Sequence, residues 1–371
     1  MARIKQQLHA GDAALTPALN KLKRDADRAL RSGTFSVTEK EITPPSGDKH
    51  DYLSIAPYWW PNPNTSNGLP YVRRDGQVNP ERDQSSDRRR LDQMIQTVMT
   101  LALGYYLIGR DEYSTHAARL IRVWFLDPPS KMNPHLKYAQ AVPGRHIGRG
   151  AGIIETHNLP ELIDAVALLS NAKSWTRTDR QQFQEWVDAY LTWLIDSPEG
   201  KTEAHAENNH GTWYDVQAAS YALLVGRNGP AKKVMGEFAA KRITKQIEPD
   251  GRQPRELART RSWHYAVFGL EALFNAAAIA EKVGVDLWHF QTDDHRGIRT
   301  ALDWLLPFAT GAKPWTDKQL SAFQPERLAP LLRRAALQYR DPRYEQALGK
   351  LPRISGDERW RLINANIQQL K

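Results

Sequence analysis

Four residues in two segments of the sequence could together perform acid–base and carboxylate-binding chemistry. Asn209 and His210 stand just before an apolar helical stretch, Val216 to Leu224, and Arg259 precedes Tyr265 by six residues. Asn and His side chains can hydrogen-bond a carboxylate, and a helix start favours negative charge nearby. An arginine beside a phenol stabilises the phenolate. Alone, the first segment more often means a helix cap and an ordinary histidine, and the Arg–Tyr spacing alone indicates nothing.

A run of three aromatic residues, Tyr58, Trp59 and Trp60, is flanked by prolines. The three rings cannot all face one core, so at least one is expected to be exposed or to line a cleft. Flat rings stack on the apolar faces of pyranose sugars, which predicts a sugar subsite. An equally good interpretation is that the rings pin a long loop onto the helices.

A further polar segment, residues 138–150, combines glycines with hydrogen-bonding side chains. Arginines among glycines can meet carboxylates with planar, bidentate forks. The segment lacks the Gly-Lys-Ser/Thr ending of a phosphate-binding loop, and no strand is predicted before it, so a nucleotide site is not indicated. Besides the aromatic run, the predicted substrate-binding residues are Tyr138, Gln140, Arg145, His146, Arg149, Trp213 and His264.

Neither a metal nor a cofactor is predicted. The chain has no cysteine, which excludes thiolate zinc ligation and disulfides. His205, Glu207 and His210 do not have the His-Glu-x-x-His spacing of a zinc site.

The net charge of +9 favours an anionic partner. The basic residues form no tail and match no nucleic-acid-binding signature, so nucleic acid is not the expected partner. No apolar stretch approaches the roughly 18 residues that a membrane helix needs. Charge alone does not identify the partner, and the sequence indicates no oligomeric state.

Helices must position these residues, because apolar residues recur at three- and four-residue spacing from Leu91 onward. Short Gly, Pro and Asp turns between the apolar stretches predict antiparallel helix hairpins. We therefore predict an all-α fold and a single domain over residues 1–371. Hairpins in one long chain can form a bundle, an open solenoid or a closed ring, and the lack of a fixed-period repeat slightly favours the ring. Long site-forming loops are predicted near residues 51–84, 133–156, 205–214 and 250–265.

Taken together, these motifs resemble the alginate lyase superfamily, in which Asn-Asn-His precedes one helix and an Arg followed by Tyr begins a later one. The Tyr-Trp-Trp-Pro-Asn-Pro run and the six-residue Arg–Tyr spacing resemble polysaccharide lyase family 38 most closely. The resemblance covers roughly residues 51–274. It implies an α/α toroid or barrel, as (α/α)7 or an incomplete (α/α)6, and a catalytic set formed by Asn209, His210, Arg259 and Tyr265.

The resemblance also implies the substrate and the reaction. The expected partner is an acidic polysaccharide, a β-1,4-linked polyuronate such as glucuronan or mannuronate-rich alginate, which is cleaved by β-elimination. It further implies a periplasmic or secreted enzyme. Residues 1–30 carry charges throughout and lack the apolar segment of a secretory signal, so the residues themselves indicate either a cytosolic protein or one whose signal has been removed.

Two other classes of function are compatible with the same residues. A glycoside hydrolase would need two carboxylates flanking the scissile bond, and Asp215, Glu155, Glu203 and Glu207 are available. A non-catalytic protein could use the same aromatic and basic residues to hold an acidic glycan. A product that absorbs in the near ultraviolet would separate the lyase from both alternatives.

Overall fold

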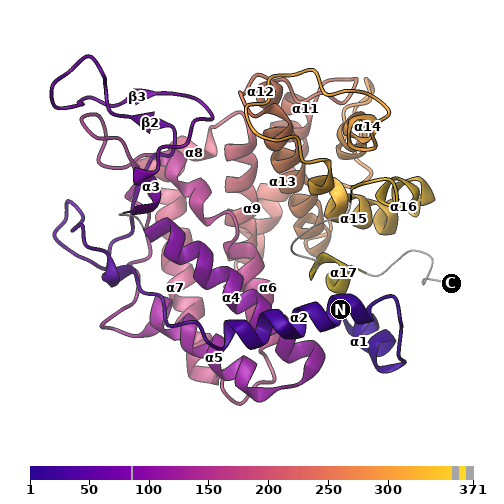
Figure 1. The fold of residues 1–371 in the computed structure, drawn as a ribbon, viewed down its shortest axis with the longest axis horizontal. Helices are drawn as coiled ribbons and strands as arrows, with labels where there is room; N and C mark the ends of the chain where they lie inside the picture. Colours follow the sequence, from indigo (N-terminus) through magenta and orange to yellow (C-terminus); the bar gives the residue numbers. More distant parts are fainter. Residues whose placement is uncertain (85–86, 353–358, 365–371) are drawn as a thin grey trace. The chain divides into compact units, whose positions relative to one another are not determined.

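A computed structural model describes residues 1–84, 87–352 and 359–364. Most of these residues are helical, so the predicted all-α class is confirmed (Figure 1). Contacts divide the chain into two compact units. The first unit comprises residues 1–25, 207–212 and 235–371, and the second comprises residues 26–206 and 213–234. A single catalytic domain over residues 1–371 stays a prediction.

The second unit contains the strands and most of the helices that precede residue 207. Its elements are η1 (Val37–Glu39), β1 (Leu53–Ile55), β2 (Trp59–Trp60), β3 (Val72–Arg73), α3 (Glu81–Gln84), α4 (Asp87–Ile108), α5 (Asp111–Ile121), η2 (Arg122–Leu126), β4 (Tyr138–Ala141), η3 (Gly150–Thr156), α6 (Leu159–Leu168), α7 (Arg177–Asp196) and α8 (Pro198–Ala204). Three helices include residues of both units: α2 (Thr16–Ala29), α9 (Asn209–Leu224) and α10 (Asn228–Phe238).

The first unit contains the C-terminal helices. Its remaining elements are α1 (Ala2–His9), η4 (Ala239–Ile243), α11 (Thr244–Gln246), α12 (Pro254–Leu257), α13 (Ser262–Lys282), α14 (Ile298–Ala309), η5 (Pro325–Leu328), α15 (Ala329–Tyr339), α16 (Pro342–Leu348) and α17 (Arg359–Ile363). Helix α13 packs against α12 and α14, and α15 packs against α16.

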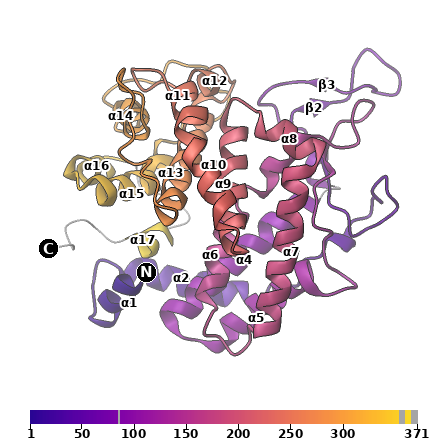
Figure 2. The same ribbon diagram turned by 180° about the vertical axis from the view of Figure 1, so that it is seen from behind.

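Short turns form the helix hairpins that the sequence predicts. Helices α4 and α5 are in contact and are joined by two residues, of which Gly109 adopts a φ of 86° that favours glycine. A Cβ at Gly104 would lie 3.2 Å from the ring of Tyr113, so glycine permits the close approach of these two helices. Helix α8 follows at the end of α7 (Figure 2).

A capping box begins α7. The side chain of Thr176 accepts a hydrogen bond from the Asp179 N–H, and the Asp179 carboxylate accepts one from the Thr176 N–H. Arg122 binds the same carboxylate, and these donors hold the pKa of Asp179 down at about 2 although burial opposes the shift. This carboxylate has a structural role at a helix start.

Two of the predicted long loops contain regular structure. The segment near 51–84 includes three short strands, and the segment near 133–156 includes β4, which pairs in parallel with β1. The other two loops are shorter than predicted, because α9 begins at Asn209 and α13 begins at Ser262. Asn209, His210 and Tyr265 therefore lie in the first turns of helices.

Candidate active site

A buried hydrogen-bond pair joins the start of α9 to α12 within the first unit. The backbone N–H of Asn209 donates to Glu256 Oε1 at 2.7 Å, and Asn209 Nδ2 donates to Glu256 Oε2 at 2.7 Å. Asn209 is 1% exposed and Glu256 is 3% exposed. Because both carboxylate oxygens are engaged by one residue, the Asn209 carboxamide is held in a single orientation.

The Glu256 carboxylate lies within the electrostatic reach of two other predicted catalytic residues. Burial raises its pKa, whereas the two bonds from Asn209 and the charges of His210 and Arg259 act in the opposite direction. The structure thus gathers Asn209, His210 and Arg259 around one buried acid. The sequence reasoning missed Glu256, although it lies three residues before Arg259, because nothing local distinguishes it from a surface glutamate.

Arg259 and Tyr265 are in contact, which their spacing alone does not indicate. The Arg259 guanidinium carbon lies 3.9 Å from the centroid of the Tyr265 ring, within the range of a cation–π interaction. Tyr265 is 7% exposed and occupies the first turn of α13, where its N–H donates to the Arg261 carbonyl. A positive charge therefore lies over the face of the phenol. The catalytic roles of both residues stay a prediction.

The start of α13, which carries Tyr265, is held by a segment distant in sequence. No side chain within the helix caps it. Instead, the Ser262 N–H donates to the Lys318 carbonyl at 3.1 Å and the Trp263 N–H donates to Gln319 Oε1 at 3.0 Å. These bonds satisfy N–H groups that a helix start leaves without partners. Gln319 is a second supporting residue that the sequence reasoning missed.

His264 lies beside Tyr265 with its own partners. Its ring meets the Tyr265 ring edge-on, with centroids 5.1 Å apart, and stacks on Phe268. Its Nδ1 contacts the Arg327 guanidinium, so this nitrogen acts as the acceptor. The predicted substrate contact of His264 would therefore use other parts of the ring.

In the second unit, the aromatic run forms a small hairpin. Strand β2 pairs antiparallel with β3, and both of its tryptophans are half-buried. The Arg145 guanidinium carbon lies 5.4 Å from the Trp59 ring centroid, and Arg74 lies at the same distance from Trp60. Tyr58, which precedes the strand, is also half-buried. The hairpin thus presents partly exposed rings beside positive charges.

A hydrogen-bond chain supports two other predicted binding residues of this unit. The Ser54 hydroxyl donates to the buried Glu155 carboxylate at 2.6 Å and accepts from the Gln140 N–H at 2.7 Å. Arg149 Nη2 then donates to Gln140 Oε1 at 2.6 Å. Gln140 has a φ of 49°, which is uncommon for a residue other than glycine. The chain fixes Gln140 and gives the Arg149 guanidinium a defined position.

Some predicted binding residues are in different surroundings from those expected. Trp213 is 1% exposed and packs edge-on against His157, with centroids 5.1 Å apart. Trp213 therefore lies in the core of the second unit, and its contact with substrate stays a prediction. Tyr138 is also buried, at 6% exposure, whereas His146 is exposed.

Two of the carboxylates that a hydrolase could use are engaged by other side chains. Glu207 in the first unit pairs with Arg255 at 2.5 Å. In the second unit, Glu155 accepts hydrogen bonds from Tyr52 and Ser54. Within the described ranges there is no cluster of three His, Asp or Glu side chains placed to hold a metal ion. No helix among those residues is long and apolar enough to cross a membrane.

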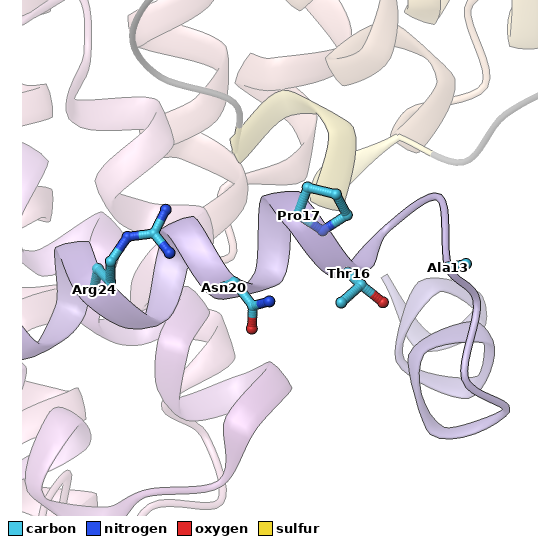
Figure 3. A pocket seen from close by; sticks show the side chains of 5 residues that line it. All are labelled: Ala13, Thr16, Pro17, Asn20 and Arg24. Carbon is cyan, nitrogen blue, oxygen red and sulfur yellow. The ribbon is translucent and has the colours of Figure 1, made fainter.

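A surface pocket at the start of α2 lies apart from these residues in sequence. Ala13, Thr16, Pro17, Asn20 and Arg24 line it, and the last four lie along one helix (Figure 3). It contains none of the predicted site residues. We assign it no role in the chemistry.

Both a family model and a solved structure match most of this chain. The alginate lyase family model matches residues 36–315. The crystal structure of an alginate lyase from Bacteroides ovatus has a TM-score of 0.93 and 41% sequence identity, and the match covers 98% of this chain and 96% of that chain. A search of curated proteins finds no match.

More distant structures share the fold. Two variants of alginate lyase A1-III complexed with a tetrasaccharide are each 14% identical, with TM-scores of 0.58 and 0.59. The matches cover 90% and 96% of this chain, respectively, and 95% of each of those chains. These likenesses support the predicted α/α toroid class. The chain therefore belongs to the alginate lyase family and is a polysaccharide lyase.

Proposed function

We propose that the enzyme cleaves β-1,4-linked polyuronate by β-elimination, with glucuronan as its main substrate and mannuronate-rich alginate as a second one. The observation that supports this proposal most is the contact between Arg259 and the Tyr265 ring, at 3.9 Å, beside the Asn209–Glu256 pair. A cation, an amide and a phenol are gathered within one unit. This set suits a reaction at a carbon next to a carboxylate.

The first step removes the proton at C5 of a uronate. That proton is weakly acidic while the neighbouring carboxylate is ionised, so the enzyme must stabilise charge that develops on the carboxylate. Asn209, His210 and Arg259 would bind this group through hydrogen bonds and positive charge. The Tyr265 phenolate, stabilised by Arg259, would accept the C5 proton.

The second step expels the oxygen at C4. As the C4–O bond breaks, the electron pair left at C5 forms the C4–C5 double bond, and the Tyr265 phenol returns its proton to the departing oxygen. In β-1,4-linked glucuronate and mannuronate, the C5 proton and the C4 oxygen lie on the same face of the ring. One residue can therefore serve both transfers. For a C5 epimer the proton lies on the opposite face, where His210 would be the base.

Recognition of the polymer would fall to the second unit. The half-buried rings of Trp59 and Trp60 suit stacking on sugars, and Arg145 and Arg149 suit uronate carboxylates. We further propose a periplasmic or secreted location, where such polymers would be met.

The test is incubation of the purified enzyme with glucuronan, polymannuronate, polyguluronate and a neutral β-1,4-glucan. We expect a product absorbing in the near ultraviolet, formed fastest from glucuronan and not from the neutral glucan. New reducing ends without that absorbance would contradict β-elimination. Faster cleavage of either alginate polymer would contradict the substrate preference alone.

A further inference from the structure

Glu256 is a buried carboxylate of the first unit that has no role in the proposed reaction. It is 3% exposed and lies in the short helix α12, and it makes two 2.7 Å bonds to Asn209, which is 47 positions earlier in the sequence. A buried carboxylate requires such compensation. Neither the motif comparison nor the proposed mechanism uses it.

The surroundings of the pair leave it little room to move. A Cβ on Gly269 of α13 would lie 3.7 Å from Asn209 Cβ, 3.5 Å from Glu256 Cγ and 2.8 Å from Gln253 Oε1. Gln253 is itself held by a bond from its Nε2 to the Ala266 carbonyl at 3.0 Å. Helix α13 therefore packs directly on the pair, and glycine at position 269 permits this.

One atom of the Asn209 carboxamide is not accounted for by the protein. Asn209 Oδ1 is buried and has no hydrogen-bond partner among the described residues. The Nδ2 group also carries two hydrogens, of which the bond to Glu256 uses one. A buried polar atom without a partner is rare and suggests a ligand that supplies one.

We propose that Glu256 is a positioning residue for the lyase reaction: it fixes the Asn209 carboxamide so that its second N–H and its Oδ1 are available to the bound uronate. The inference rests on the proposed function. The N–H would bind the uronate carboxylate, and Oδ1 would accept from a sugar hydroxyl. Fixed donors stabilise developing charge without reorganising during the reaction.

Only a carboxylate can perform this task at position 256. Both of its oxygens accept, which matches the two N–H donors of Asn209. The amide in Glu256→Gln has nearly the same shape but one acceptor and one donor, so one N–H of Asn209 would face an N–H. The carboxamide would then be free to turn. The shorter Glu256→Asp keeps the charge but reaches only one of the two donors.

The experiment is a double-mutant cycle with Glu256→Gln and Asn209→Ala, in which kcat and KM are measured from the ultraviolet-absorbing product. We expect Glu256→Gln to lower kcat by about 10- to 100-fold, with KM changed by less than about 3-fold, because the lost interaction acts mainly in the transition state. In the Asn209→Ala background, the same change should cost less than about 3-fold, since its target is gone. Equal losses in both backgrounds would overturn the proposal.

A matched control separates this effect from the general loss of a buried carboxylate. Asp179→Asn removes a 7% exposed carboxylate that accepts several hydrogen bonds at the start of α7. It should lower the melting temperature and leave the kcat of the folded enzyme unchanged. If Glu256→Gln does not fold, Glu256→Asp enters the same cycle, with an intermediate loss expected and the same criterion for rejection.

The two proposals fail in different ways. If the wild-type enzyme forms no ultraviolet-absorbing product from any polyuronate, the proposed function is wrong. If the wild type is active and Glu256→Gln retains its kcat, only the positioning role is wrong.

Discussion

The predicted catalytic residues and the predicted binding residues are held in different ways. In the first unit, Asn209 and Tyr265 lie in the first turns of two helices and are 1% and 7% exposed. In the second unit, Trp59 lies on a two-residue strand and is half-buried, and Arg145 is exposed. Buried helix starts fix the direction of a donor, whereas a hairpin can adapt to a polymer. The first arrangement suits chemistry at one atom and the second suits recognition of a chain.

The largest expected effect tests the first arrangement. Tyr265→Phe keeps the ring under Arg259 but removes the group that transfers the proton. We expect kcat to fall by about 1,000-fold or more, within the range of general acid–base catalysis, while substrate binding measured by calorimetry changes little. A kcat within 10-fold of the wild type would exclude Tyr265 as the acid–base residue.

A smaller loss is expected for Arg259→Lys. Lysine keeps the positive charge but lacks the planar guanidinium that lies 3.9 Å from the Tyr265 ring centroid. We expect kcat to fall by about 10- to 100-fold. The onset of activity should also shift to higher pH, because the phenolate is less stabilised. The matched control is Arg252→Lys, since that arginine is exposed and pairs with Asp250 in its own turn. An unchanged pH–rate profile for Arg259→Lys would argue against the stacked charge as the cause.

The second arrangement predicts a different kinetic result. Trp59→Ala removes a half-buried ring beside Arg145. KM for the polymer should rise by about 5- to 50-fold, corresponding to about 1–2 kcal/mol of stacking, while kcat stays within about 2-fold. Ile195→Ala, an exposed apolar residue of α7, serves as the control and should change neither value. If Trp59→Ala lowered kcat as much as it raised KM, the assignment of chemistry to the first region and of recognition to the second would be wrong.

The smallest expected effect concerns the pH dependence of stability that the buried Glu155 contributes. Burial raises the pKa of Glu155 in the folded state above its ordinary 4.5. The stability this group contributes is therefore fully present below its unfolded pKa and is lost as the pH rises through the folded pKa. Glu155→Gln removes this dependence. Relative to the wild type, the variant should gain unfolding free energy between pH 4.5 and pH 7.5.

Denaturant unfolding of both proteins at the two pH values would measure this change. A wild type that gained stability over the variant as the pH rose would contradict the raised pKa. In the kinetic assay, Glu155→Gln should affect kcat less than Glu256→Gln does, since its hydrogen-bond chain leads to Gln140 and Arg149, not to Asn209.

The sequence by itself determined the helical class, and its resemblance to a known family supplied the candidate catalytic residues, whose roles stay a prediction. Apolar spacing of three and four residues reports helix faces directly. The six-residue gap between Arg259 and Tyr265 indicates nothing alone, and the structure brings the two side chains into contact. The sequence could not fix the helix starts, so Asn209 and His210 were expected before α9 and not in its first turn.

Only the tertiary structure decided which distant residues support the site. The Asn209–Glu256 pair spans 47 positions and the Trp263–Gln319 bond spans 56, and neither leaves a periodic signal. Burial of Trp213 against His157 likewise depends on how helices pack, not on residue type. Local periodicity determines which face of a helix is apolar, but a hydrogen bond between distant elements exists only once packing has brought donor and acceptor together.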